Sequence, residues 1–214
     1  MDFKLEKHIE RLMARYPQLE VCREDISKAY QLLETAYVNG RKLLVSGNGG
    51  SASDSEHIVG ELMKEFKLKR RIYHGLAEEM RKISPELGEV LAVNLQGALP
   101  AISLTGHSSL TTAFMNDSEP ELIFAQQVNG YGKKGDVYLG ISTSGNSRNV
   151  LYAAVTAKSK GLKVIGLTGQ CENKLMRYAD VCIRVPETET YKIQELHLPV
   201  YHCLCMMLED KFFG

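Results

Sequence analysis

The chain has 214 residues, which is enough for one domain of ordinary size with a substantial core. Hydrophobic residues account for 44% and charged residues for 24%, a balance typical of soluble globular proteins that excludes a disordered chain. The 26 Lys and Arg residues equal the 26 Asp and Glu residues, so the formal net charge is zero. This argues against a bulk electrostatic affinity for nucleic acid or anionic membranes, although a local patch of charge is still compatible with it.

The N-terminus (MDFKLEKHIERLM) is charged throughout and has no apolar signal core, and no stretch approaches the length of a membrane span. The five cysteines are odd in number and scattered, so a disulfide scaffold is not expected and a reducing cytoplasm fits best. Cys203 and Cys205 could be read as a metal pair, but their apolar neighbours favour ordinary packing. We therefore expect a cytoplasmic protein that binds neither nucleic acid nor membrane.

Residues 3–39 predict two helices, because apolar residues recur at helical spacing until Asn39-Gly40 ends the pattern. Residues 42–46 (KLLVS) then form a short apolar run. A glycine turn follows, and a helical pattern runs from Ser51 to about Phe66. This order predicts strand, turn and helix.

Residues 67–97 differ from the rest of the chain, because they are charged and interrupted by Gly75, Pro85 and Gly88. We expect an insertion or lid between two sheet elements; a solvated helical hairpin is an equal alternative. A basic cluster at the start of this segment could attract a phosphate, although charge runs are usually exposed faces. The cluster comprises Lys67, Lys69, Arg70 and Arg71.

Further short apolar runs alternate with helical patterns along the rest of the chain, and a long final helical pattern covers about 188–208. Short, nearly continuous apolar strands that alternate with helices predict an α/β fold with a parallel sheet covered on both faces. The runs lie at 100–104, 136–141, 163–168 and 180–185.

The first candidate loop is GNGGSASDSEH at 47–57, which follows the first predicted strand. Its glycines allow a tight turn, and Ser51 then lies at a helix start, where free N–H groups and the helix dipole favour an anion or a hydroxyl-rich ligand. The spacing is neither the dinucleotide fingerprint nor a P-loop. A plain glycine turn with a serine N-cap explains this loop equally well on its own.

The second candidate loop is ISTSGNS at 141–147, again between a strand and a helix. Hydroxyl groups beside a helix N-terminus can bind a phosphate monoester without a metal or a lysine, and a capping turn needs only one serine. Both loops follow strand ends, where ligands of open sheets bind. We therefore expect phosphate binding by Ser142, Thr143, Ser144 and Ser147.

Two pairs of polar residues could carry chemistry. His57 and Glu61 are four apart, and Gln194 and His202 are eight apart, so each pair shares about one helix face. Together the pairs offer a four-ligand set for zinc. From spacing alone, however, an i,i+4 His/Glu pair is more often a surface contact.

The motifs GNGGSASDSEH, GDVYLGISTSGNS, KVIGLTG, DVCIRVP and KIQELH-x-x-x-x-H occur in this order. Together they resemble the sugar isomerase (SIS) domain in its phosphoheptose isomerase form. The resemblance runs from about residue 25 to the end and leaves 67–97 unmatched. It implies one domain over 1–214, a flavodoxin-like three-layer αβα sandwich with a central five-stranded parallel sheet. Helices within 1–39 would then make oligomer contacts.

The resemblance also implies an aldose–ketose isomerase that converts D-sedoheptulose 7-phosphate to D-glycero-D-manno-heptose 7-phosphate through an enediol, for heptose biosynthesis, in a homotetramer with shared active sites. It gives Glu61 and His202 the acid–base chemistry. It implies one zinc per subunit, bound by residues matching His57, Glu61, Gln194 and His202. Substrate would contact Asn48, Gly49, Gly50, Ser51, Glu61, Asn116, Asp117, Ser142, Thr143, Ser144, Ser147 and Gln194.

Two other functions stay open from the sequence. Some relatives are non-catalytic phosphosugar-binding modules that bind a protein partner such as the replication initiator, but here the retained Glu61 and His202 favour an enzyme. Another phosphorylated ketose or an amino-sugar phosphate could also be the substrate. Pro199 departs from the family pattern and predicts a bend in the final helix. His197 is expected to pack or to lie in an interface.

Overall fold

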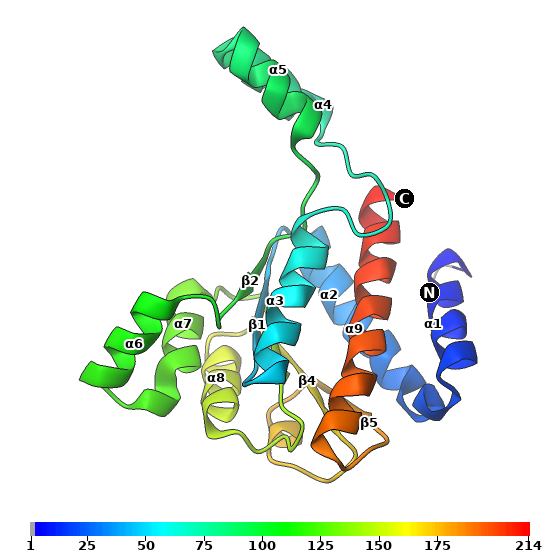
Figure 1. Cartoon of the computed structure of the whole chain (residues 1–214), viewed down its shortest axis with the longest axis vertical. Coiled ribbons are helices and arrows are strands. Elements are labelled where there is room, and N and C mark those ends of the chain that lie inside the picture. Colours follow the sequence, from blue (N-terminus) through cyan, green and yellow to red (C-terminus); the bar gives the residue numbers. More distant parts are fainter. Residues whose placement is uncertain (1–2) are drawn as a thin grey trace.

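The computed structural model describes residues 3–214 of the chain. Its centre is a parallel sheet with the strand order β2-β1-β3-β4-β5 (Figure 1). The strands are β1 (Leu43–Ser46), β2 (Ala101–Ser103), β3 (Val137–Ile141), β4 (Lys163–Gly169) and β5 (Val181–Val185). The five predicted strands are confirmed, and so is the flavodoxin-like order.

Helices cover both faces of the sheet, so the predicted three-layer sandwich is confirmed. Leu43, Val45 and Leu139 belong to one hydrophobic cluster with α2 (Arg23–Val38), α3 (Gly50–Met63) and α9 (Thr190–Phe213). Leu44 and Tyr138 belong to the other cluster, with α7 (Ile123–Tyr131) and α8 (Arg148–Ser159). Consecutive residues of β1 thus point to opposite faces, and both faces are dry, which explains the unbroken apolar runs.

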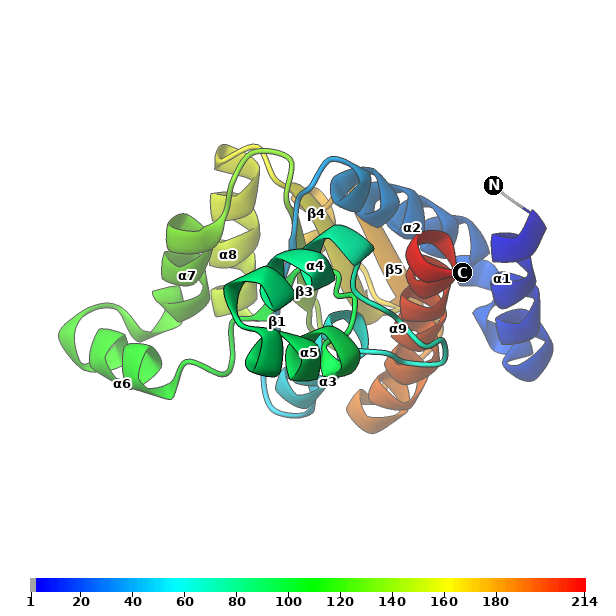
Figure 2. The ribbon, with the colours of Figure 1, turned by 90° about the horizontal axis from the view of Figure 1, so that it is seen from above.

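The two helices expected in the N-terminal segment are α1 (Phe3–Arg15) and α2, joined by the 3-10 turn η1 (Pro17–Cys22). α1 packs on the outer side of α9, away from the sheet (Figures 1 and 2). The imidazole of His8 lies 2.7 Å from the carboxylate of Asp210 and joins the two helices.

Helix α9 is longer than its sequence pattern predicts. It continues to Phe213 rather than ending near 208, and it passes through Pro199 without a break. The proline removes one helical hydrogen bond. Because Val200, Tyr201 and Leu204 are buried in the core on the same helix, packing holds the helix together beyond that position.

Residues 74–94 form a helical hairpin that projects from the body of the molecule (Figure 1). The hairpin consists of α4 (His74–Ile83) and α5 (Pro85–Asn94). It lies between the end of α3 and the start of β2, and therefore at the amino-terminal edge of the parallel strands. Both candidate loops lie at the opposite, carboxyl-terminal edge. A lid role stays a prediction, since the hairpin does not cover these loops of its own chain.

The remaining elements connect the layers. α6 (Ser108–Asp117) follows β2, and short 3-10 turns lie at η2 (Pro120–Leu122) and η3 (Leu175–Arg177). Among residues 3–214, no helix has both the length and the apolar character needed to cross a membrane. All five cysteines are free thiols, and Cys203 and Cys205 are buried in the core, as ordinary packing requires.

Candidate active site

The glycine loop joins the end of β1 to the start of α3 and is held very close to that helix. A methyl group added at Gly47 would lie 2.5 Å from the backbone oxygen of Ser51, a distance that real Cβ atoms do not reach. One added at Gly50 would lie 2.6 Å from the side-chain nitrogen of Gln194, on α9. Close approach to the backbone therefore requires glycine at position 47, whereas at position 50 a methyl group would displace only the end of the Gln194 side chain.

The two candidate loops meet in one cavity at the carboxyl ends of β1 and β3. The cavity measures about 310 Å³, and Gln194 forms part of its wall. Ser142 and Ser147 face each other with their hydroxyl oxygens 3.0 Å apart. Ser144 is not among the lining residues; its hydroxyl accepts the backbone N–H of Asn146. The predicted residues in the lining are Asn48, Gly49, Gly50, Ser51, Ser142, Thr143, Ser147 and Gln194.

A reciprocal amide pair joins the two loops. The side chain of Asn48 donates to Asn149 at 2.9 Å, and Asn149 donates back to Asn48 at 2.8 Å. Asn149 lies in the first turn of α8, directly after the serine loop. Asn149 could not be identified from the sequence, because no local pattern marks which residue 101 positions away will face Asn48.

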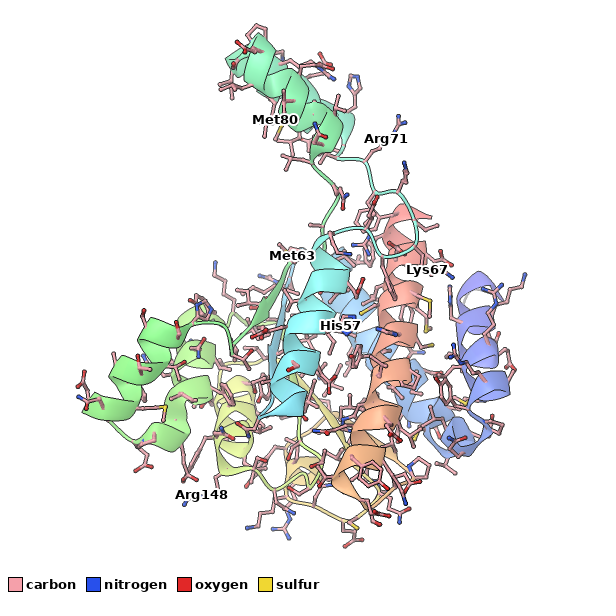
Figure 3. The ribbon with its side chains drawn as sticks, in the orientation of Figure 1. His57, Met63, Lys67, Arg71, Met80 and Arg148 are labelled. Atoms are coloured by element: carbon pink, nitrogen blue, oxygen red, sulfur yellow. The ribbon has the colours of Figure 1, made fainter. Side chains whose placement is uncertain are left out.

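A second group of polar side chains lies further along α3 and α9. The imidazole Nε2 of His57 is 3.1 Å from the carboxylate of Glu61 and 3.4 Å from Nε2 of His202. Figure 3 shows His57 between the two helices. The structure thus brings the proposed base and the proposed acid/base partner to one place, from residues 141 positions apart in the sequence.

The protonation chemistry of this group suits proton transfer. Burial lowers the pKa of His202, the neighbouring His57 lowers it further, and Glu61 only partly opposes them. His202 is therefore mainly uncharged at neutral pH and can accept a proton. The side chain of Glu61 is 12% exposed, and among the described residues its Oε2 atom has no hydrogen-bond partner. This oxygen is buried in the single chain, and the ammonium of Lys64 lies 3.7 Å from it.

Tyr201 and Asp54 orient His57 and were not identified from the sequence. The Tyr201 hydroxyl lies 3.1 Å from Nδ1 of His57 and donates to Asp54 at 3.1 Å. Burial raises the pKa of Asp54, and hydrogen bonding to Tyr201 lowers it again in part. Asp54 occupies the aspartate position of the motif GNGGS-x-x-D-x-x-H, so a signal for it was present. For Tyr201 the sequence held no such signal other than its position next to His202.

Two predicted substrate contacts lie elsewhere. Asn116 and Asp117 occupy the exposed end of α6, where the Asn116 amide donates to the Asp117 carboxylate at 2.8 Å. Neither residue lines the cavity of its own chain. The alternative interpretation as a helix-ending turn agrees with their position, because α6 ends at Asp117.

His197 is a packing residue in this chain. It is fully buried on α9, and burial lowers its pKa to about 4, so the ring is neutral. It lies three residues beyond Gln194, on the side of the helix that faces the core.

The predicted zinc ligands are only partly assembled. The separation of 3.4 Å between the Nε2 atoms of His57 and His202 is close to the roughly 3.3 Å expected between two nitrogen donors of one tetrahedral zinc. Gln194, however, packs against Gly50 in the loop cavity. Within residues 3–214, no three His, Cys, Asp or Glu side chains are grouped to hold a metal. The donor types and the His57–His202 spacing fit zinc, and zinc binding stays a prediction.

Known proteins resemble the chain over nearly its whole length. It is 40% identical over 189 residues to the phosphoheptose isomerase of Geotalea daltonii, covering 88% of this chain and 85% of that protein. It is 37% identical over 211 residues to that of Nitratiruptor sp., covering 96% and 99%. The chain belongs to the phosphoheptose isomerase family. The resemblance inferred from the sequence motifs is thereby confirmed.

A solved structure and a domain model agree with this family. The phosphoheptose isomerase from Francisella tularensis superposes with a TM-score of 0.75 at 30% identity, covering 97% of each chain. A family model described as "SIS domain" matches residues 77–169. This segment includes the serine loop and α6 but begins after the glycine loop. The family assignment therefore rests mainly on the full-length relatives.

Proposed function

We propose that the chain is an aldose–ketose isomerase that converts D-sedoheptulose 7-phosphate to D-glycero-D-manno-heptose 7-phosphate. The arrangement of α3 and α9 is the observation that supports a long sugar phosphate as the substrate. Gln194 lines the loop cavity and His202 lies eight residues further along α9, about 12 Å at 1.5 Å per residue. A phosphate bound in the serine loop would need a long sugar chain to place its first two carbons at Glu61 and His202.

The proposed reaction uses the residues of the second group directly. Glu61 removes a proton from C1 of the ketose, and neutral His202 manages the proton exchange at the two oxygens, so that a cis-enediol forms. Glu61 then returns a proton to C2, and the hydroxyl at C1 becomes the aldehyde. No atom is gained or lost. The phosphate, held by the serine hydroxyls and the start of α8, fixes the sugar so that C1 stays near Glu61.

Zinc is the expected cofactor, and His57, Glu61, Gln194 and His202 are the residues that would hold it. When bound, it would stabilise negative charge on the substrate oxygens. We expect purified protein to contain about one zinc per subunit, and apo-protein to take up zinc with measurable heat. Elemental mass spectrometry and titration calorimetry measure both. Replacing His57 with Ala should abolish the uptake, whereas equal uptake by wild type and H57A would contradict this ligand set.

A homotetramer with shared active sites, in the cytoplasm, belongs to the same proposal. The exposed position of Asn116 and Asp117, outside the cavity of their own chain, supports a role in a neighbouring subunit's site. Light scattering during size-exclusion chromatography measures the assembly. A monomer with full activity would contradict shared sites.

The direct test is an isomerase assay across pentose, hexose and heptose phosphates. The proposal expects the heptose phosphate to be turned over with the highest kcat/KM. If another phosphorylated ketose or an amino-sugar phosphate is turned over preferentially, the proposed substrate is wrong but the proposed isomerase chemistry stands. No turnover of any of them, with tight binding to a protein partner, would favour the non-catalytic module.

Tyr201→Phe is expected to lower kcat/KM about fivefold, because it removes one hydrogen bond to His57, worth about 1 kcal/mol, and keeps the ring contacts. Steady-state kinetics measures the change. Tyr37→Phe is the matched control: it removes the hydroxyl that donates to Pro100 near the start of β2 and should leave kcat/KM unchanged. Equal effects of both substitutions on kcat/KM would contradict the orienting role of Tyr201.

A further inference from the structure

A buried ion pair connects the two helices that carry the catalytic residues. Arg70 and Glu209 have side chains that are 0% and 2% exposed, and Nε of Arg70 donates to Glu209 at 2.8 Å. Arg70 was expected to belong to an exposed basic cluster. That interpretation is wrong for this residue. Its guanidinium also lies 4.9 Å from the centre of the Phe213 ring.

Arg70 caps the end of α3 at the catalytic carboxylate. Its two terminal nitrogens donate to the backbone oxygens of Glu61 and Leu62, both at 2.8 Å. The last carbonyls of a helix have no partner within the helix, and α3 ends at Met63 with an extended residue and no glycine cap. The fork of one arginine therefore replaces that cap and holds the backbone of Glu61 itself.

Glu209 fixes the other side of the connection. Its carboxylate accepts the backbone N–H groups of Phe66 at 2.8 Å and Lys67 at 2.9 Å in addition to Arg70. Burial tends to raise the pKa of Glu209, but these three donors outweigh it and lower the pKa below its ordinary value, so the group stays ionised. Glu209 follows His202 by seven residues, which places both on about the same face of α9.

Every donor and acceptor of this pair thus links α3 to α9 or to the chain between α3 and the helical hairpin. Figure 3 shows the connecting chain, with Met63 at the end of α3 and Lys67 beside the last turns of α9. We propose that Arg70 and Glu209 are positioning residues that set the separation between Glu61 and His202. This inference rests on the proposed isomerase function.

The test compares Glu209→Gln and a double variant, R70M/E209L, with wild type, using only preparations that circular dichroism shows to be folded. The double variant guards against misfolding, because replacing both members of a buried ion pair with apolar groups often preserves stability. We expect kcat to fall about 10- to 100-fold, since a displacement of about 1 Å can cost that much, while KM for the sugar phosphate changes less than about threefold. Amide hydrogen exchange over residues 61–67 should become faster in both variants.

Asp136→Asn is the matched control. The Asp136 carboxylate also accepts two backbone N–H groups, from Lys42 and Lys133, and pairs with the Lys42 ammonium at 2.6 Å. These contacts involve neither α3 nor α9, so this substitution should lower the melting temperature and leave kcat unchanged.

Wild-type kcat in folded Glu209→Gln or R70M/E209L, or a kcat loss in Asp136→Asn as large as theirs, would overturn the positioning role of the ion pair. If wild type itself turns over no sugar phosphate, the proposed function fails instead. In that case hydrogen exchange alone tests the positioning role of the Arg70–Glu209 pair. Unchanged exchange over residues 61–67 in the variants would overturn that role.

Discussion

Glu61→Gln is expected to lower kcat at least about a hundredfold, because the substitution removes the proposed base for the C1 proton and such groups supply roughly 10²–10⁴ in rate. The amide has the same size and can still accept hydrogen bonds, so binding of the sugar phosphate should be largely kept. Steady-state kinetics measures the first effect, and calorimetric titration with sedoheptulose 7-phosphate measures the second.

Glu56→Gln provides the control for this substitution. Glu56 lies on the same helix, and its exposed carboxylate accepts a hydrogen bond from Thr105 at 3.1 Å. The same chemical change there should leave kcat within about twofold, as surface substitutions usually do. Full activity of Glu61→Gln would show that Glu61 is not the base.

Gly47→Ala is expected to have the second largest effect. Its methyl group would meet the backbone oxygen of Ser51 at 2.5 Å and the Cβ of Ser51 at 2.7 Å, so the loop or the start of α3 must move. Because the loop forms one wall of the proposed phosphate cavity, KM should rise at least about tenfold, equivalent to about 1.4 kcal/mol of lost binding. Stability should fall by about 1–3 kcal/mol through overpacking.

Gly130→Ala is the matched substitution without a clash. Gly130 lies in α7, and no heavy atom would come within 4 Å of the added methyl group. Helix propensity should then raise stability by about 0.5–1 kcal/mol, with KM unchanged. Denaturant unfolding and steady-state kinetics measure both variants. An unchanged KM in Gly47→Ala would show that the glycine loop is not part of the binding cavity.

The fold could be predicted from the sequence because its signals are local. Each strand is a short, largely apolar run, and its bounds agree with the pattern to within one residue at each end. The central strands β1 and β3 are buried on both faces, whereas β2 and β5 at the edges of the sheet are partly exposed. The two loops could be predicted for the same reason, since glycines and clustered hydroxyls at strand ends restrict what the backbone can do.

The contacts that complete the site are long-range and have no local signal. Tyr201 and Asp54 are 147 positions apart, and Arg70 and Glu209 are 139 apart. In the sequence, Arg70 is one of several adjacent basic residues. Only the fold distinguishes the buried arginine from its exposed neighbours, because burial depends on what packs on it.

The direction of the helical hairpin could not be predicted either. Its helical character follows from composition and its turn from Ser84 and Pro85, where the Ser84 hydroxyl accepts the N–H of Leu87. Whether such an insertion covers the loops depends on the edge of the sheet from which it leaves. In this chain it leaves from the edge opposite to the loops, between α3 and β2.

The most direct test is conversion of sedoheptulose 7-phosphate by the purified protein in deuterium oxide, followed by NMR spectroscopy. The account predicts that an aldoheptose 7-phosphate appears with deuterium at C2, because the proton carried by Glu61 exchanges with solvent at the enediol stage. Absence of any aldose product from the folded, zinc-supplied protein would contradict the account.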